Sequence, residues 1–173
     1  MSKVSVPQKT GLELYLRNGI FGVSDSLVST VGLLSGINAN GTSRHAIIVT
    51  GIVYAFVESF SMAVGSFLSE ESAENYVGKG EVAATKPFVG GSVMFVTFIL
   101  ASLIPIAPYL FLSAASALWV SIVVSILALF IVGYLSAKIS KARVLKHAIR
   151  MALLGGLAII VGVVVGKFVN SGM

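Results

Sequence analysis

The sequence predicts an all-α membrane protein: a single domain over residues 1–173 that forms a bundle of five transmembrane helices. Three observations predict this fold class. Hydrophobic residues make up 56% of the chain and the mean hydropathy is +0.97. Charged residues make up only 11%, whereas soluble domains carry about 25%. The hydrophobic residues also gather in five stretches, each close to the roughly 20 residues that a helix needs to cross a bilayer.

Polar and helix-breaking segments separate the predicted spans. A turn-forming run at 38–45 follows the first span, and an acidic segment at 70–86 follows the second. Pro105 and Pro108 predict a tight turn between the third and fourth spans, because proline stops one helix and suits the first turn of the next. A basic linker at 138–150 precedes the last span. The spans are predicted at residues 18–37, 46–69, 88–104, 109–134 and 151–169.

Basic residues predict the orientation, because Lys and Arg are retained on the cytoplasmic side of a membrane. With a cytoplasmic N terminus, ten of the 12 basic residues lie inside and only Arg44 and Lys167 lie outside. We therefore expect the C terminus outside. We expect a cell (inner) membrane, since the sequence shows no targeting extension. The same topology explains the net charge of +5 without nucleic acid as a partner.

The residue types limit the chemistry. The chain has no cysteine, which excludes disulfides, thiolate metal sites and iron–sulfur clusters. No nucleophile, base and orienting group occur together, and no phosphate-binding glycine loop is present, so we expect neither an enzyme nor a permanently bound cofactor.

Two of the seven acidic residues, Asp25 and Glu58, fall inside predicted spans. A charged side chain at mid-bilayer costs a few kcal/mol or more, so such acids usually face a polar pathway, a counter-ion or a bound cation. Counting from the ends of the spans places Asp25 and Met62 at one level, about 12 Å from the cytoplasmic edge. Glu58 then lies one turn deeper, opposite Ser29.

Small and polar residues recur on the same faces as these acids and predict close contact between the first two helices. We interpret Asp25, Glu58 and Met62 as metal ligands of a transport pathway. The alternative is structural, with hydrogen-bonded neutral acids and methionine as packing. The two stripes are Gly22, Asp25, Ser29, Gly32 and Gly36 on the first helix, and Glu58, Ser61, Met62, Gly65 and Ser69 on the second. The predicted lining residues are Gly22, Ser29, Ser61 and Gly65.

Four more acids lie between the second and third spans. Carboxylates at the cytoplasmic mouth of a pathway would concentrate cations there, although an ordinary solvated loop is the alternative. These candidate metal-attracting residues are Glu70, Glu71, Glu74 and Glu81.

Two motifs are similar to those of a known family. Arg17-Asn18-Gly19 with the run from Gly22 to Gly32, and the run from Glu58 to Gly65, resemble the first- and second-helix motifs of vacuolar iron transporters. The Ile104 to Pro108 turn and the pair Gly155-Gly156 are weaker matches, and the resemblance covers nearly the whole chain. Two features depart from the family pattern. Ser66 stands where a glutamate is common. Many members also insert long glutamate-rich helices between the second and third spans, where this chain has only 17 residues.

The resemblance implies export of Fe²⁺, and often Mn²⁺, from the cytoplasm, coupled to protons. It implies a homodimer through the first helix, with a path between the subunits. Asp25, Glu58 and Met62 correspond by position to pathway residues of the family. Carboxylates with a thioether independently favour a transition metal over Mg²⁺ or Ca²⁺. Two alternatives remain open: a proton-coupled exporter of organic cations, and a membrane scaffold that transports nothing.

Overall fold

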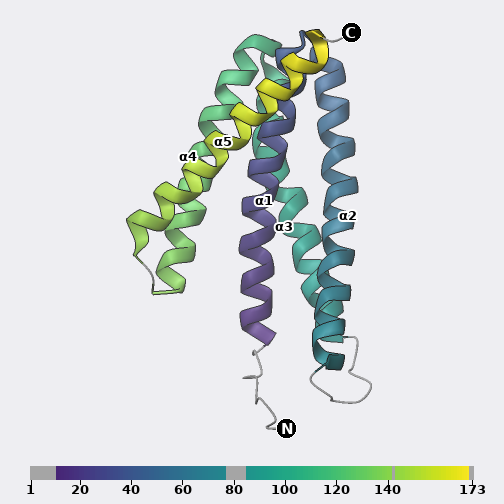
Figure 1. Cartoon of the computed structure of the whole chain (residues 1–173), viewed down its shortest axis with the longest axis vertical. Coiled ribbons are helices and arrows are strands. Elements are labelled where there is room, and N and C mark those ends of the chain that lie inside the picture. The colour runs from purple at the N-terminus through teal and green to yellow at the C-terminus, as the bar shows by residue number, and fades with distance from the viewer. Residues whose placement is uncertain (1–10, 77–84, 142, 172–173) are drawn as a thin grey trace.

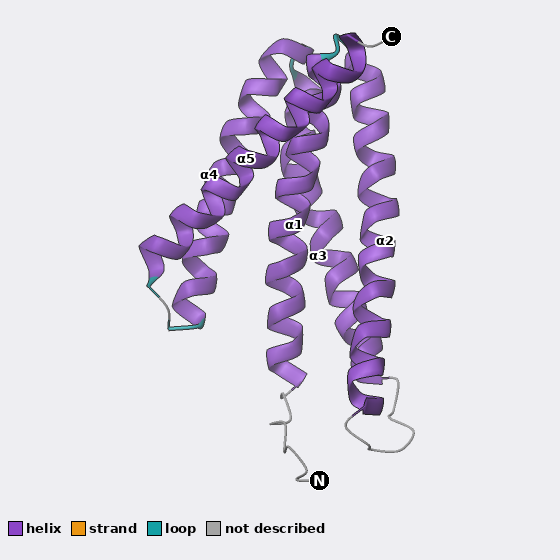
Figure 2. Cartoon of the chain, in the orientation of Figure 1, coloured by secondary structure: helices purple, strands orange, loops and turns teal. Residues whose placement is uncertain are grey.

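Five α-helices account for nearly all of the residues that the computed structural model describes, 11–76, 85–141 and 143–171 (Figures 1 and 2). All five are long and apolar enough to cross a membrane, and no strand occurs in the described ranges. The predicted all-α fold with five membrane-spanning helices is therefore confirmed. The helices are α1 (Gly11–Ala39), α2 (Arg44–Tyr76), α3 (Thr85–Phe111), α4 (Ala114–Ile139) and α5 (Val144–Ser171).

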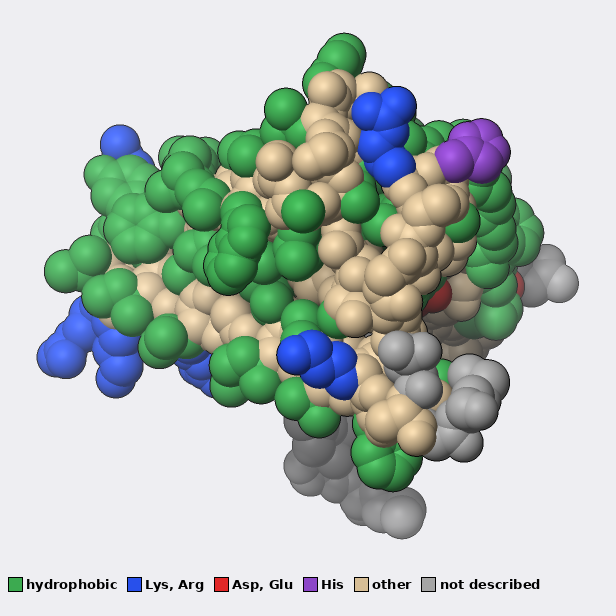
Figure 3. Space-filling view, turned by 90° about the horizontal axis from the view of Figure 1, so that it is seen from above, with side chains coloured by type: hydrophobic (Ala, Val, Ile, Leu, Met, Phe, Trp, Pro, Cys, Tyr) green, Lys and Arg blue, Asp and Glu red, His purple; other side chains and the backbone are tan. Residues whose placement is uncertain are grey.

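The outward surface is largely hydrophobic. Phe60, Trp119 and Phe168 are 64%, 69% and 78% exposed, and hydrophobic side chains cover much of the view onto one end of the molecule (Figure 3). A surface this apolar is unfavourable in water but suits the hydrocarbon of a bilayer. The protein is therefore a multi-pass integral membrane protein.

Helix α1 lies at the centre of the bundle and contacts each of the other four helices. Its central residue Leu27 is fully buried with Ala101 of α3 and Leu129 of α4. A second cluster, nearer the α1–α2 turn, joins Leu34 of α1 to Ile47 of α2. Any functional group on α1 is consequently held by several neighbouring helices.

Glycines bring α1 and α5 into backbone contact at one end of the bundle. A Cβ atom on Gly36 would lie 2.6 Å from the carbonyl oxygen of Gly162, and one on Gly32 would lie 3.1 Å from that of Ala158. The sequence predicted that the stripe containing Gly32 and Gly36 meets α2, and for these two glycines that prediction is wrong. Small residues permit a close helix contact but do not specify which helix supplies it.

Helix α3 continues through Pro105 and Pro108 and ends at Phe111, so the predicted turn between these prolines is wrong. Both prolines are buried, and the hydroxyl of Ser121 on α4 donates a 2.8 Å hydrogen bond to the carbonyl oxygen of Pro105. Proline is more frequent inside membrane helices than inside soluble ones. The chain instead reverses at Ser113, which caps the start of α4.

Candidate functional site

Helices α1 and α2 bring the two intramembrane acids together. Asp25 and Glu58 are both half-buried and close enough for their charges to interact. One turn deeper, the hydroxyl of Tyr54 meets the side chain of Ser29 and lies within electrostatic range of both acids. The Ser29 hydroxyl also donates a 2.7 Å hydrogen bond to the backbone oxygen of Asp25. These four residues form a polar cluster inside the membrane-spanning region.

The register of α1 against α2 differs from the predicted one by about a turn. Asn18 donates a 2.8 Å hydrogen bond to the Ser66 hydroxyl, and both side chains are short, so these residues lie at one level. Asp25 is seven residues beyond Asn18 and Glu58 eight before Ser66, which at 1.5 Å per residue gives similar depths of about 11 and 12 Å. Asp25 therefore faces Glu58, with Met62 nearer the Asn18 level.

The predicted register differs from the observed one because depth was counted from Arg17 on the first span and from Glu70 on the second, as if these two residues lay at the same level. Their side chains do meet, at 3.3 Å. Both side chains are long, however, and they bridge residues at different heights along the two helices. The shorter Asn18–Ser66 pair is the better indicator of backbone register.

Helix α3 holds Tyr54 in place. The Tyr54 ring packs against the fully buried Phe98, with ring centroids 6.5 Å apart, which is a favourable aromatic separation. The Tyr54 hydroxyl lies on the α1 side, where it meets Ser29. Sequence reasoning assigned no role to Tyr54, although its position four residues before Glu58 places both on one helix face.

One side of Asp25 is left uncovered by its own chain. Asp25, Gly32 and Gly36 lie on the same face of α1, at spacings of seven and four residues. Helix α5 covers Gly32 and Gly36, whereas its earlier residues Met151 and Gly155 pack on α4 instead. Helix α5 thus diverges from α1 toward the Asp25 level (Figure 1).

The other predicted pathway residues occupy different environments. Met62 is half-buried, while Ser61 and Gly65 are exposed on α2, and a Cβ atom on Gly65 would meet nothing within 4 Å. Gly22 is instead buried against Met94 and Thr97 of α3. The structure therefore brings Asp25, Ser29 and Glu58 together, and it places Gly22 in the packing between α1 and α3.

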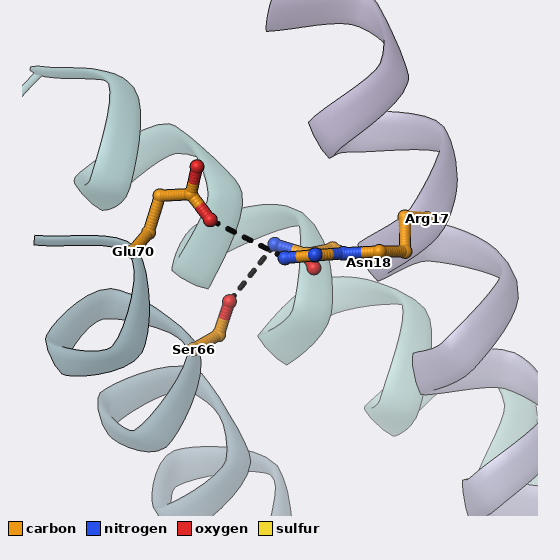
Figure 4. Close-up of polar contacts among 4 residues, drawn as sticks. All are labelled: Arg17, Asn18, Ser66 and Glu70. Carbon is orange, nitrogen blue, oxygen red and sulfur yellow. Dashed lines mark hydrogen bonds and ion pairs between the residues drawn. The ribbon is translucent and has the colours of Figure 1, made fainter. Parts of the chain in front are cut away.

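Three of the four candidate metal-attracting acids form part of a helix rather than a loop. Glu70, Glu71 and Glu74 belong to the last turns of α2, and Glu81 lies outside the described residues. Glu70 pairs with Arg17 beside the Asn18–Ser66 hydrogen bond (Figure 4). Within the described residues, no group of three His, Asp or Glu side chains could hold a metal ion. Asp25 and Glu58 of one chain are therefore too few to fill the coordination shell of a six-coordinate ion by themselves.

Comparison with known proteins identifies the family. The sequence matches the VIT family over residues 16–81 and 77–167. It is 28% identical to vacuolar iron transporter homolog 3 of Arabidopsis thaliana over 172 aligned residues, which cover 91% of this chain and 84% of that protein. It is 22% identical to vacuolar iron transporter 1 of Eucalyptus grandis, over 90% of this chain and 87% of that protein. The chain therefore belongs to the VIT family.

Proposed function

We propose that this protein is a membrane transporter that exports divalent transition-metal ions, Fe²⁺ and also Mn²⁺, from the cytoplasm in exchange for protons. The observation that carries the proposal is that Asp25 of α1 and Glu58 of α2 lie at similar depths inside the membrane-spanning region, in the register that the Asn18–Ser66 hydrogen bond sets. Family relatives whose names describe vacuolar iron transporters support the choice of cargo.

The paired acids suit an exchange mechanism. Two carboxylates that interact in a medium of low dielectric repel each other when both are ionised. A divalent cation relieves this repulsion, and so does a proton, but the same oxygen cannot hold both. Metal arriving from the cytoplasm would displace protons from Asp25 and Glu58, and protons from outside would then displace the metal.

Met62 supports the preference for a transition metal. It is half-buried on α2, one turn from Glu58 toward the Asn18–Ser66 level. A thioether is a soft ligand that Mg²⁺ and Ca²⁺ do not favour. Fe²⁺ passing Met62 would gain a ligand that the hard cations would not.

A second copy of the chain would complete the coordination shell. One Asp, one Glu and one Met are too few ligands for a six-coordinate ion, whereas a two-fold homodimer doubles the set around its axis. The uncovered side of Asp25 and the exposed Ser61 and Gly65 favour an interface along α1 and α2.

The charge distribution supports a cytoplasmic N terminus. Arg17, Lys86 and Lys138 lie near the helix ends that are on the side of the N terminus, while Arg44 and Lys167 lie near the opposite ends. Because basic residues stay inside, metal would enter from the Arg17 end. In a cell membrane this direction is export.

The test is Fe²⁺ and Mn²⁺ flux into proteoliposomes under an imposed proton gradient. Asp25→Asn and Glu58→Gln should each abolish gradient-dependent flux, because each removes one negative charge from the pair. The control is Glu13→Gln, which removes an exposed charge from the first turn of α1 and should leave flux unchanged. Full flux in both pathway variants would contradict the proposal.

Export of organic cations is a second candidate, and one observation favours it. The aromatic ring of Tyr54 lies near the acids, and aromatic faces attract quaternary ammonium ions. Proton-driven flux of tetraethylammonium without flux of Fe²⁺ would support this alternative. Absence of any flux in folded protein would instead favour a scaffold role.

A further inference from the structure

The start of α5 carries a stripe of basic side chains. Arg143, which directly precedes α5, is followed by Lys146 after three residues and by Arg150 after four more. This spacing places the three side chains on one helix face, and all three are exposed. We call these residues the basic stripe. Two more exposed lysines, Lys138 and Lys141, lie where α4 ends, so five cations gather at one end of the α4–α5 hairpin.

The hairpin itself supplies no negative charge to balance these cations. All seven acidic residues lie at positions 13–81, and the segments that form α4 and α5 contain no Asp or Glu. Within the part of the chain that the structure describes, the one ion pair joins Arg17 of α1 to Glu70 of α2. The basic stripe is therefore available to anions from outside the chain.

Arg150 lies beside the apolar part of α4 rather than beyond its end. Gly133 of α4 packs against Ala148 and Met151 of α5, which places Arg150 close to the level of Gly133. Helix α4 continues six residues further, to Ile139, or about 9 Å at 1.5 Å per residue. A long basic side chain at such a depth extends along the helix toward the polar layer of the bilayer, where lipid phosphates lie.

Beyond Arg150, the same face of α5 becomes apolar. Leu154, Leu157 and Val161 follow Arg150 by four, seven and eleven residues, spacings that keep them on one face. Their side chains are 48%, 57% and 60% exposed. This face thus presents cations first and hydrocarbon next, which is the order of the anionic headgroup and the acyl chains in a phospholipid. A small soluble anion would use only the charged part.

We propose that the basic stripe binds the headgroup of an anionic phospholipid, whose acyl chains lie along Leu154, Leu157 and Val161. Clusters of four to eight basic residues beside a transmembrane helix are typical of anionic-lipid recognition. Retention of basic residues on one side of a membrane explains which end of the helices they occupy, but it does not require them to share a face. The lipid gives this end of the hairpin, where α5 diverges from α1 (Figure 1), a partner outside the chain.

The experiment measures binding of dioleoylphosphatidylglycerol to the full-length protein in detergent, by native mass spectrometry. Dioleoylphosphatidylcholine has the same acyl chains without the net charge, and it should bind more weakly. Lys146→Gln and Arg150→Gln should each reduce the affinity for phosphatidylglycerol by about fivefold, the equivalent of about 1 kcal/mol for each basic residue near a membrane surface. Neither change should alter the binding of phosphatidylcholine. Equal affinity of the native protein for the two lipids would overturn the proposal.

A matched variant separates the basic stripe from net charge. Arg143→Gln/Lys146→Gln/Arg150→Gln should remove the preference for phosphatidylglycerol. Arg44→Gln/Lys86→Gln/Lys167→Gln removes as many exposed charges from other helix ends and should retain the preference. Equal losses in the two triple variants would show general attraction and would overturn the proposal. If the first triple variant does not fold, Lys146→Gln and Arg150→Gln are each compared with Lys86→Gln, and equal affinities would overturn it.

Competition distinguishes a lipid from a soluble anion. Excess inorganic phosphate or glycerol phosphate should not displace phosphatidylglycerol, because neither contacts the apolar part of the face. Complete displacement by either would indicate a site for small anions alone and would overturn the lipid assignment. These measurements need no metal flux, so their outcome is independent of the proposed transport function.

Discussion

Gly32 of α1 and Gly162 of α5 lie backbone against backbone, so that a Cβ atom at position 162 would collide with the carbonyl oxygen of Gly32. The same contact repeats one turn further along, where Gly166 approaches the carbonyl oxygen of Gly36. Inside a bilayer, apolar side chains gain little by leaving lipid for protein, so helix association depends on close packing of this kind. This crossing anchors α5 to the half of α1 that lies away from Asp25.

We expect Gly162→Ala to destabilise the protein by about 1–3 kcal/mol, the usual range for an overpacked site. The added methyl group must separate two backbones, because no flexible side chain can move aside. Gly156→Ala is the matched control on the same helix, since a Cβ atom there meets nothing within 4 Å. Thermal unfolding in detergent measures both, and equal unfolding temperatures would contradict the role of the crossing.

The Ser121–Pro105 hydrogen bond predicts a second stability effect. Ser121→Ala removes a buried donor and leaves the Pro105 carbonyl oxygen without it, which should cost about 1–2 kcal/mol. Ser92→Ala is the control, because Ser92 is exposed and bonds only to its own helix. If both variants unfold alike, Ser121 does not stabilise the proline-containing part of α3.

The existence of the five helices could be predicted from hydropathy because the thickness of a bilayer sets the length of each span. The ends were less predictable. Pro105 and Pro108 are typical helix breakers, but proline is tolerated inside membrane helices, and α3 continues through both residues to Phe111. The helix that contacts Gly32 and Gly36 could not be predicted either, because their partner on α5 lies more than a hundred residues away in the sequence.

The acids Asp25 and Glu58 could be found from the sequence because a charge within an apolar span is conspicuous. Their mutual register could not be predicted to better than a turn, since the flexible reach of Arg17 and Glu70 hides the true offset. Tyr54 was missed because a tyrosine in an apolar span is ordinary, and its contacts with Ser29 and Phe98 are visible only in the structure.

Tyr54→Phe should reduce metal flux by about tenfold while leaving stability nearly unchanged. The ring stays packed on Phe98, but the hydroxyl that meets Ser29 beside the two acids is lost, and one hydrogen bond is worth roughly 1 kcal/mol or somewhat more. Tyr134→Phe, an exposed hydroxyl on α4, is the control. If Tyr54→Phe transports metal as fast as the native protein, the Tyr54 hydroxyl has no role in transport.

A homodimer along α1 and α2 predicts a specific cross-link. The chain contains no cysteine, so a single introduced thiol can react only with its copy in another chain. Ser61 is exposed on α2, next to the open space at Gly65. Ser61→Cys should therefore form a disulfide-linked dimer in membranes under mild oxidation. Gly65→Leu, added to this variant, should reduce the cross-link because the larger side chain keeps the two surfaces apart.

The matched control for that cross-link is Val123→Cys, which places a thiol on an equally apolar and exposed face of α4. Random collisions in the membrane would link both variants to the same extent, whereas an interface along α1 and α2 links only Ser61→Cys. Equal yields, or a Ser61→Cys yield insensitive to Gly65→Leu, would exclude this interface. The second set of metal ligands would then have to approach Asp25 from another direction, because one chain presents a single Asp25–Glu58 pair and an incomplete shell.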